Sequence, residues 1–431
     1  MQHSISISLL TGGSDRPYVF GLATSLILQG LTLDLIGSDE LDLLEFRRES
    51  KITFLNLRGS SDPNASPLAK TARILRYYAK LFLYAATAKP PIFHILWNNR
   101  FEIFDRTILM FYYRFLRKKV VLTVHNVNAR RRDRSDTFLN RVTLRIQYHS
   151  ANHVFVHTER MKTELVKEFG VRAAHITVIP FGINNSLPNT TLTPCEAKQK
   201  FGLSNKKKAI LFFGRITPYK GLDYLIAAFR DLLKRHNEYC LIIAGRVDRC
   251  EAYWKALHTQ IDAEVRNGNV LIKDSFVPDD EAEVYFKAAD VLVLPYRDIY
   301  QSGVLFTGQH FGIPIIAADV GSFGEDIVEG RTGFLFRPGD ANNLATTIER
   351  YFQSDLYGEL SKRREDIHAH AAKLHSWDTV ARMTKDVYSN LMQQASQTEI
   401  GTSSPDTLVA TRANERECGF DEIAITNRNH H

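Results

Sequence analysis

Near its middle, the chain reads Ile210-Leu-Phe-Phe-Gly-Arg-Ile-Thr-Pro-Tyr-Lys-Gly-Leu-Asp-Tyr-Leu225. The apolar run at the start of this stretch predicts a buried strand, and the pattern from Leu222 to Arg235 predicts a helix. Gly214 and Gly221 mark the turn between the two elements. A strand, a turn and a helix in this order form the repeating unit of a parallel α/β sheet, so the stretch favours that fold class.

Two cations, Arg215 and Lys220, lie on the turn of this unit. Ligands of parallel α/β sheets bind beyond the carboxyl ends of the strands, where this turn is expected. Cations beside a helix N-terminus suit a diphosphate, because the free N–H groups and the helix dipole also attract negative charge. The alternative is an ordinary surface turn whose two cations are solvated.

The chain has 431 residues, more than one hydrophobic core usually holds, so we expect two domains. Its four cysteines are scattered without C-x-x-C spacing, which argues against a zinc site or a disulfide framework and favours a reducing compartment. The N-terminus lacks a basic region followed by a long apolar one, and no apolar run of about 18 residues occurs. We therefore expect a cytoplasmic protein without a signal peptide or a membrane span.

The formal net charge of +7 first suggests a nucleic-acid partner, so an RNA-binding protein is one hypothesis. The sequence contains no helix-turn-helix, RNP or zinc-finger pattern that would support it. Anionic donors, anionic lipid surfaces or phosphorylated acceptors explain the same charge, and we favour them over nucleic acid.

Strand and helix patterns alternate along most of the chain, which predicts parallel α/β sheets in both halves. In the first half, the predicted strands are Ser4–Leu10, Leu33–Ile36, Ile52–Leu57, Ile92–Leu96, Val120–Val124, His153–Val156 and Ile176–Ile179. In the second half, they are Ala209–Phe213, Leu241–Ala244, Val270–Ile272, Val291–Leu294, Ile313–Ala317 and Gly333–Phe336. The predicted helices between the first strands include Tyr18–Gly30, Leu68–Thr87, Asp105–Leu116 and Glu159–Phe169.

The stretch between Pro180 and Lys207 is polar and predicts a loop that links two domains. A last helical pattern runs from Trp377 to Met392, and periodicity ends at about Gln394. The predicted organisation is a first domain at 1–183, a linker at 184–206, a second domain at 207–372, a helix at 373–394 and a disordered tail at 395–431.

A second motif region begins at Ser302-Gly-Val-Leu-Phe-Thr-Gly-Gln-His-Phe-Gly-Ile-Pro-Ile-Ile-Ala and continues through Gly330-Arg-Thr-Gly-Phe-Leu-Phe-Arg-Pro-Gly-Asp340. Phe276-Val-Pro-Asp279 and the strand that ends at Tyr296 lie between it and the first stretch. In order and spacing, these segments resemble the donor half of family 4 glycosyltransferases. The resemblance is specific over roughly 207–342 and looser across the first half.

The resemblance implies the GT-B fold, in which two Rossmann-like doubly wound parallel-sheet domains face each other across a cleft and the last helix returns to the first domain. It implies a retaining transferase that moves a sugar from a UDP- or GDP-sugar to a hydroxyl of a glycolipid, oligosaccharide or surface polysaccharide. No cofactor is expected. No metal is expected either, since Asp133-Arg-Ser-Asp136, the nearest pattern to D-x-D, lies in an arginine-rich loop.

By the same resemblance, Arg215 and Lys220 stabilise the departing diphosphate. The Arg215 guanidinium can bind two phosphate oxygens at once, and the Lys220 ammonium acts as a point charge. The expected helix at 303–311 would add N–H donors from Ser302, Gly303 and Val304, although Ser302 could equally be an ordinary helix cap. Further donor-binding positions implied by the family are Gly13, Gly214, Val277 and Gln301.

The chain departs from the family at the two glutamates spaced E-x7-E, one of which contacts the donor sugar and the other the ribose. Counting from Gly312 places Ile299 and Thr307 at these positions. Thr307 can still bind a ribose hydroxyl and Gln301 can contact the sugar. The loss also raises an alternative, a non-catalytic GT-B protein that binds nucleotide sugar or partners a transferase.

His125 ends a predicted strand, where several family members have a histidine that faces the reacting sugar. The resemblance implies a catalytic role for His125, with Arg215 and Lys220, although a structural histidine is an equal alternative, as for His94 and His157.

Two basic features concern the acceptor side. Lys70, Arg73, Arg76 and Lys80 recur at helical spacing and could contact an anionic membrane or form a solvated helix face. Arg130, Arg131 and Arg132 follow His125 and could bind an acceptor phosphate or be solvated. We expect peripheral association with the inner membrane face.

Overall fold

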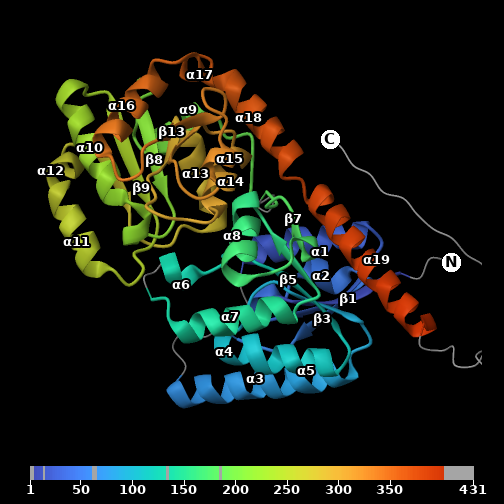
Figure 1. The fold of residues 1–431 in the computed structure, drawn as a ribbon. Helices are drawn as coiled ribbons and strands as arrows, with labels where there is room; N and C mark the ends of the chain where they lie inside the picture. The colour runs from blue at the N-terminus through green and yellow to red at the C-terminus, as the bar shows by residue number, and fades with distance from the viewer. Residues whose placement is uncertain (1–3, 13–14, 61–65, 133–134, 184–186, 402–431) are drawn as a thin grey trace, which may run out of the picture. The chain divides into compact units, whose positions relative to one another are not determined.

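The computed structural model describes residues 4–12, 15–60, 66–132, 135–183 and 187–401 (Figure 1). Residues up to Ser389 belong to one compact unit, and a second unit begins at Asn390. Within the first unit, the chain forms two parallel sheets in succession. Each strand predicted from the sequence is present, with bounds that differ by at most two residues.

The first sheet has seven parallel strands in the order β3-β2-β1-β4-β5-β6-β7. They are β1 (Ser6–Leu10), β2 (Thr32–Gly37), β3 (Ile52–Asn56), β4 (Ile92–Ile95), β5 (Lys119–Thr123), β6 (His153–Val156) and β7 (Ile176–Val178). The order reverses between β1 and β4, and such a switch point opens a crevice at the carboxyl ends of the strands.

The helices of this half are α1 (Arg16–Leu28), α2 (Leu44–Arg48), α3 (Pro67–Thr87), α4 (Glu102–Phe104), α5 (Met110–Phe115), α6 (Ala129–Arg132), α7 (Phe138–Ser150) and α8 (Glu159–Phe169). A π-helical turn at Asp105–Leu109 joins α4 to α5. Buried side chains of α3, α5, α7 and α8 share one core with β4, β5 and β6, so these helices cover the same face of the sheet (Figure 1). Ser66, Thr137 and Thr158 begin α3, α7 and α8 by accepting a backbone N–H, which explains where these helices start.

The second sheet has six parallel strands in the order β10-β9-β8-β11-β12-β13. They are β8 (Lys208–Phe213), β9 (Tyr239–Ala244), β10 (Val270–Lys273), β11 (Val291–Leu294), β12 (Ile315–Ala318) and β13 (Gly333–Phe336). Along β8, Ile210 and Phe212 enter the core on one face, and Ala209 and Leu211 enter the core on the other. Because both faces are buried, the strands are continuous apolar runs, which is why the sequence revealed them.

The helices of the second half are α9 (Pro194–Lys200), α10 (Leu222–Arg235), α11 (Glu251–Gln260), α12 (Asp262–Arg266), α13 (Asp279–Ala288), α14 (Gly303–His310), α15 (Phe323–Asp326), α16 (Ala341–Phe352), α17 (Asp355–Gly358) and α18 (Leu360–Leu374). The helices predicted to begin within the two motif regions, at 222–235 and 303–311, are α10 and α14. Short 3-10 turns lie at Asp39–Leu41, Ala173–His175 and Pro218–Lys220.

The expectation of a loop throughout 184–206 is wrong, because α9 lies within this range. Thr193 and Glu196 form a reciprocal capping box at its start, and Ala197 is buried in the core of the second sheet. Lys198 donates to both carboxylate oxygens of Asp290, at 2.9 and 2.8 Å, in a buried ion pair. The compact second half therefore begins before residue 207.

The last helix, α19 (Trp377–Gly401), continues past Gln394, where a tail without periodicity was expected. Before the unit boundary, it contacts the first half of the chain: Tyr388 Oη lies 2.6 Å from His94 Nδ1, and Lys385 Nζ donates to the Gln29 carbonyl at 2.7 Å. Residues 402–431 of the expected tail lie outside the described residues.

Candidate functional site

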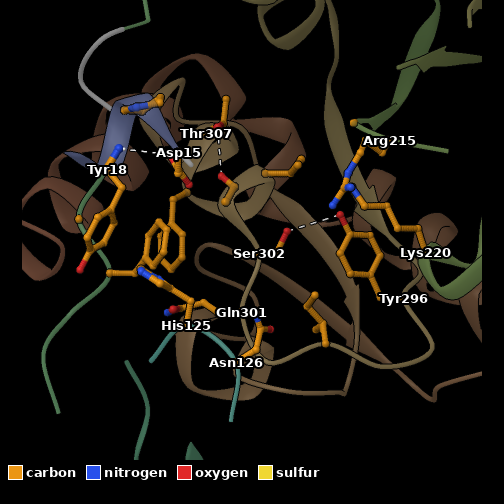
Figure 2. A pocket seen from close by; sticks show the side chains of 18 of the residues that line it. Asp15, Tyr18, His125, Asn126, Arg215, Lys220, Tyr296, Gln301, Ser302 and Thr307 are labelled. Carbon is orange, nitrogen blue, oxygen red and sulfur yellow. Dashed lines mark hydrogen bonds between the residues drawn. The ribbon is translucent and has the colours of Figure 1, made fainter. Parts of the chain in front are cut away.

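A pocket of about 490 Å³ lies beyond the carboxyl ends of strands from both sheets. Figure 2 shows Arg215 and Lys220 on one side of it and Tyr18 and His125 on the other. Residues predicted from the sequence that line the pocket are His125, Gly214, Arg215, Lys220, Gln301, Ser302, Gly303, Val304 and Thr307. Segments far apart in the sequence are thus brought to one cavity.

The cationic wall follows directly from the β8 turn. Gly214 has a φ of 99°, so glycine is needed for the turn, and a Cβ there would lie 2.8 Å from the Lys220 Nζ and displace it. The buried ammonium of Lys220 lies 5.1 Å from the ring centre of Tyr296. Arg215 is more exposed and pairs with Asp248 at 3.0 Å. Both cations lie at the edge of the same pocket.

The N-terminus of α14 completes this wall. Ser302 precedes the helix, but its side chain makes no capping hydrogen bond, and its Oγ instead lies 3.4 Å from Tyr296 Oη. A Cβ added to Gly303 would meet no atom of the described chain within 4 Å, so packing inside the protein does not require glycine at this position. The first N–H groups of α14 therefore remain available to an anion beside Arg215 and Lys220.

The opposite wall contains His125, which is hydrogen-bonded to His157 behind it. His157 Nδ1 lies 3.2 Å from the Ile179 carbonyl, which only accepts, so this nitrogen carries the proton. His157 Nε2 is then an acceptor, and His125 Nδ1, 3.1 Å away, must donate to it. Burial lowers the pKa of His157 to about 4 and the pKa of His125 well below 6.5, which keeps both rings neutral.

With the proton on Nδ1, the Nε2 atom of His125 has a lone pair and can only accept a hydrogen bond. The atom is buried, and none of the described residues donates to it. Trp97 stacks on the imidazole at a centroid distance of 4.2 Å, and Tyr18 packs edge-on at 4.8 Å, so the ring is held in place. A held, neutral acceptor at a pocket wall suits a ligand hydroxyl.

Two further acceptors belong to the pocket. The Oε1 atom of Gln301 is buried and has no hydrogen-bond donor among the described residues. Asp15 accepts from the Tyr18 N–H at 3.2 Å as the cap of α1, and burial raises the pKa of its carboxyl. Together with His125, these groups make the side of the pocket away from Arg215 a set of hydrogen-bond acceptors.

The two positions where the family has glutamates also line the pocket. Ile299 is buried, and Thr307 donates to the Gly303 carbonyl at 3.1 Å within α14 (Figure 2). Counting along the sequence therefore placed both positions beside the cavity, although neither supplies a carboxylate.

Several predicted positions lie elsewhere. Val277 is buried in the core of the second sheet and is not one of the residues that line this pocket. Arg130 pairs with Glu102 at 3.2 Å and Arg131 with Glu168 at 2.6 Å, so carboxylates already offset part of this basic run. Gly13 and the side chain of Arg132 lie outside the described residues.

Other pocket residues carried no local sequence signal. They include Asp15, Tyr18, Trp97, Asn126, Phe181 and Trp377. Trp97 directly follows a predicted strand and Phe181 lies two residues beyond one, and aromatic residues near strand ends are the one pattern that could have marked them. Trp377 packs where a Cβ on Gly21 or Gly182 would clash, and its Nε1 donates to the Ile183 carbonyl at 2.7 Å.

Two absences apply to the described residues alone. No group of three or more His, Cys, Asp or Glu side chains in these ranges is arranged to hold a metal ion. No helix in the same ranges combines the length and the apolar character needed to cross a bilayer.

Comparison with known proteins agrees with this geometry. A family model described as Glycosyltransferase Family 4 matches residues 16–187, and one described as Glycosyl transferases group 1 matches residues 207–354. A D-inositol 3-phosphate glycosyltransferase from Streptomyces avermitilis is 29% identical over 249 residues, which cover 57% of this chain and 53% of the relative. A mannosylfructose-phosphate synthase from Agrobacterium fabrum is 28% identical over 244 residues, covering 55% of this chain and 52% of the relative. The chain spans about half the length of these curated relatives.

Solved structures match over nearly the whole chain. A sucrose-phosphate synthase from Thermosynechococcus elongatus has a TM-score of 0.72 at 18% identity and covers 90% of this chain and 99% of its own. HepE from Anabaena, solved in complex with UDP-glucose, has a TM-score of 0.68 at 18% identity, with coverages of 89% and 99%. At this identity, the likeness shows the fold, and it confirms the expected GT-B architecture. The chain belongs to the group 1, family 4 glycosyltransferases and has their GT-B fold.

Proposed function

We propose that the protein is a retaining glycosyltransferase that moves a sugar from a nucleotide-diphosphate sugar to a hydroxyl acceptor. The observation that carries the proposal is the polarity of the pocket. Arg215, Lys220 and the uncapped N-terminus of α14 form one side, and His125 Nε2 and Gln301 Oε1, both without donors among the described residues, belong to the other. A diphosphate matches the first side, and a sugar linked to it, with its hydroxyl groups, matches the second.

The diphosphate belongs on the cationic side. When the bond between the sugar C1 and the phosphate oxygen breaks, negative charge grows on the diphosphate. Lys220, Arg215 and the α14 N–H groups are already fixed beside it, and preorganised charges of this kind stabilise the transition state more than the ground state. These residues therefore act on the leaving group.

The sugar belongs on the acceptor side, beside His125 and Gln301, whose Nε2 and Oε1 atoms accept from none of the described residues. A new bond forms between C1 and the acceptor oxygen on the face that the phosphate leaves, and the hydroxyl proton passes to the departing phosphate oxygen. Configuration at C1 is retained, and no carboxylate nucleophile is required. Thr307 takes the ribose position in this arrangement.

The substrate classes draw on the related proteins. HepE was solved with UDP-glucose, which supports a UDP-sugar as donor. Relatives named for inositol 3-phosphate and for mannosylfructose phosphate support an acceptor or product that carries a phosphate. We infer a small polyol, sugar or glycolipid acceptor.

We also propose weak association with an anionic membrane through the outer surface of α3–α7. Large apolar side chains that are exposed on these elements are Leu68, Leu75, Leu83, Phe101, Ile103, Ile108, Phe111, Phe115, Phe138, Leu139 and Val142. Across the described residues of the second half, those exposed are Phe276, Val328 and Leu374. Apolar surface of this kind among basic residues is typical of an interfacial site.

A thermal-shift screen across nucleoside diphosphates and their sugars, followed by turnover assays with the best ligand, tests the proposal. Ligands that bind the native state raise its melting temperature. We expect UDP or GDP sugars to do so and the purified chain to release the nucleoside diphosphate. Binding without turnover on any acceptor would favour the non-catalytic alternative, and salt-sensitive RNA binding without nucleotide binding would favour the RNA-binding one.

A further inference from the structure

A second cavity, of about 570 Å³, lies between α3 and the loop that joins β4 to α4. Arg58, Lys70, Arg73 and Arg100 all line it, and no residue of its described lining is acidic. Basic side chains that converge on one cavity create a positive potential there, which attracts an anion. The chemistry of the lining thus points to an anionic ligand.

The geometry of α3 shows that this is a built site rather than a generally basic helix. Lys70, Arg73, Ile74, Tyr77 and Tyr78 recur every three or four residues, so they share one face of the helix, and all five line the cavity. Arg76 and Lys80 are exposed and do not belong to the lining. The basic residues of α3 therefore divide into two on the cavity side and two on the outer side.

Hydrogen bonds hold the cavity floor. Tyr77 Oη donates to Asn99 Oδ1 at 2.6 Å, and Tyr78 Oη donates to Asp105 Oδ1 at 2.9 Å. The Asn99 N–H donates to the other Asp105 oxygen at 2.6 Å. The π-helical turn carries Asp105, and its carboxylate is occupied by these floor contacts. The loop that carries Arg100 is thereby tied to α3.

The same loop borders both this cavity and the donor pocket. Trp97 lines the donor pocket and Asn99 lines the basic cavity, so their Cα atoms are at most about 7.6 Å apart. On the other side, Arg58 donates to the carbonyl of Gly12, where a Cβ would lie 2.6 Å from the Trp97 carbonyl. A ligand anchored by Arg58 and Arg100 would thus lie next to the wall of the donor pocket.

We propose that this cavity binds the phosphate ester of the acceptor substrate and so selects phosphorylated acceptors. The inference rests on the proposed transferase function and names the acceptor class for it. An arginine guanidinium can donate two parallel hydrogen bonds to two phosphate oxygens, and Lys70 adds a point charge. The tyrosine and phenylalanine rings of the lining provide an apolar wall for the carbon skeleton that carries the phosphate.

The test compares two double variants with the same loss of charge. Arg73→Gln with Arg100→Gln removes two cations from the cavity, and Arg76→Gln with Lys80→Gln removes two from the outer face of α3. The probes are glycerol 3-phosphate, as a soluble phosphate monoester, and phosphatidylcholine vesicles that contain phosphatidic acid. Calorimetry and vesicle co-sedimentation measure binding, and UDP binding serves as a measure of the donor pocket.

We expect the cavity variant to weaken glycerol 3-phosphate binding at least tenfold and the outer-face variant less than twofold, with UDP affinity unchanged in both. Loss of vesicle binding in the cavity variant alone, without soluble binding by the wild type, would assign the phosphate to a lipid headgroup. Equal loss of glycerol 3-phosphate binding in both variants, or no binding of either probe by the wild type, would overturn the proposal. Failure of UDP to bind the wild type would instead count against the proposed transferase function.

Discussion

The two walls of the donor pocket use different chemistry. The wall from the second half is cationic, with Arg215, Lys220 and the N-terminus of α14. Apart from Asp15, the wall from the first half is neutral and largely aromatic, and one of its polar atoms, His125 Nε2, is set by a chain of hydrogen bonds that ends at the Ile179 carbonyl. The cationic wall offsets the negative charge of the diphosphate, and the neutral wall fixes which nitrogen of His125 carries the proton. Substitutions in the two walls should therefore have separable effects.

The largest effect is expected on the cationic wall. Arg215→Ala and Lys220→Ala should each lower donor turnover at least tenfold, because each removes a charge that stabilises the leaving diphosphate. Lys234→Ala, on the exposed surface of α10, removes the same charge away from the pocket and should leave turnover unchanged. Steady-state rates with the preferred donor measure the effect. Near-normal rates in both folded pocket variants would mean that this wall does not hold the diphosphate.

A smaller effect, about tenfold in turnover, is expected from the neutral wall. His157→Phe removes the acceptor that fixes the proton on His125 Nδ1, whereas His157→Gln keeps an oxygen acceptor and should recover much of the activity. Nitrogen-15 NMR of the imidazoles reports the tautomer directly.

The control for this change is His153→Phe, on β6, whose imidazole lies 2.9 Å from Thr177 Oγ1. This substitution should leave the His125 tautomer as it is. A His157→Phe enzyme with wild-type rate and an unchanged His125 signal would contradict the hydrogen-bond chain and leave His157 as a packing residue.

The difference between the two walls also explains which residues of the site could be predicted from the sequence. The cationic wall comes from segments that are continuous in sequence, so glycines and cations at fixed spacing reveal it. The neutral wall combines Tyr18, Trp97, His125 and Phe181, which follow different strands and meet only in the folded sheet. The helix α9 was missed because its capping residues Thr193 and Pro194 resemble loop composition when read alone.

The membrane proposal gives a weaker contrast between the two halves. Phe115 and Phe138 of the first half are each 83% exposed, and Phe276 of the second half is 66% exposed. Phe115→Ser with Phe138→Ser should lower partition onto phosphatidylglycerol vesicles several-fold, because a ring at the membrane surface is only partly buried and gains a fraction of the roughly 1.5–3 kcal/mol that full burial of a phenylalanine contributes. Phe276→Ser should have no effect. High salt should weaken wild-type binding, and equal partition of both variants at low salt would leave the α3–α7 surface as ordinary solvated protein.

The smallest effect concerns Thr307, where the cationic wall departs from its family. Thr307→Glu places a carboxylate at the position that the resemblance assigns to the ribose, and glutamate is well tolerated in the middle of a helix such as α14. Nucleoside diphosphate binding should tighten about fivefold, since a carboxylate accepts hydrogen bonds from ribose hydroxyls more strongly than a threonine does. Calorimetry with UDP and with its 2′-deoxy analogue separates this cause from a general change in charge. The gain should shrink for the deoxy nucleotide, which lacks one of the hydroxyls. A gain that is equal for both nucleotides, or no gain in a well-folded variant, would show that Thr307 does not face the ribose.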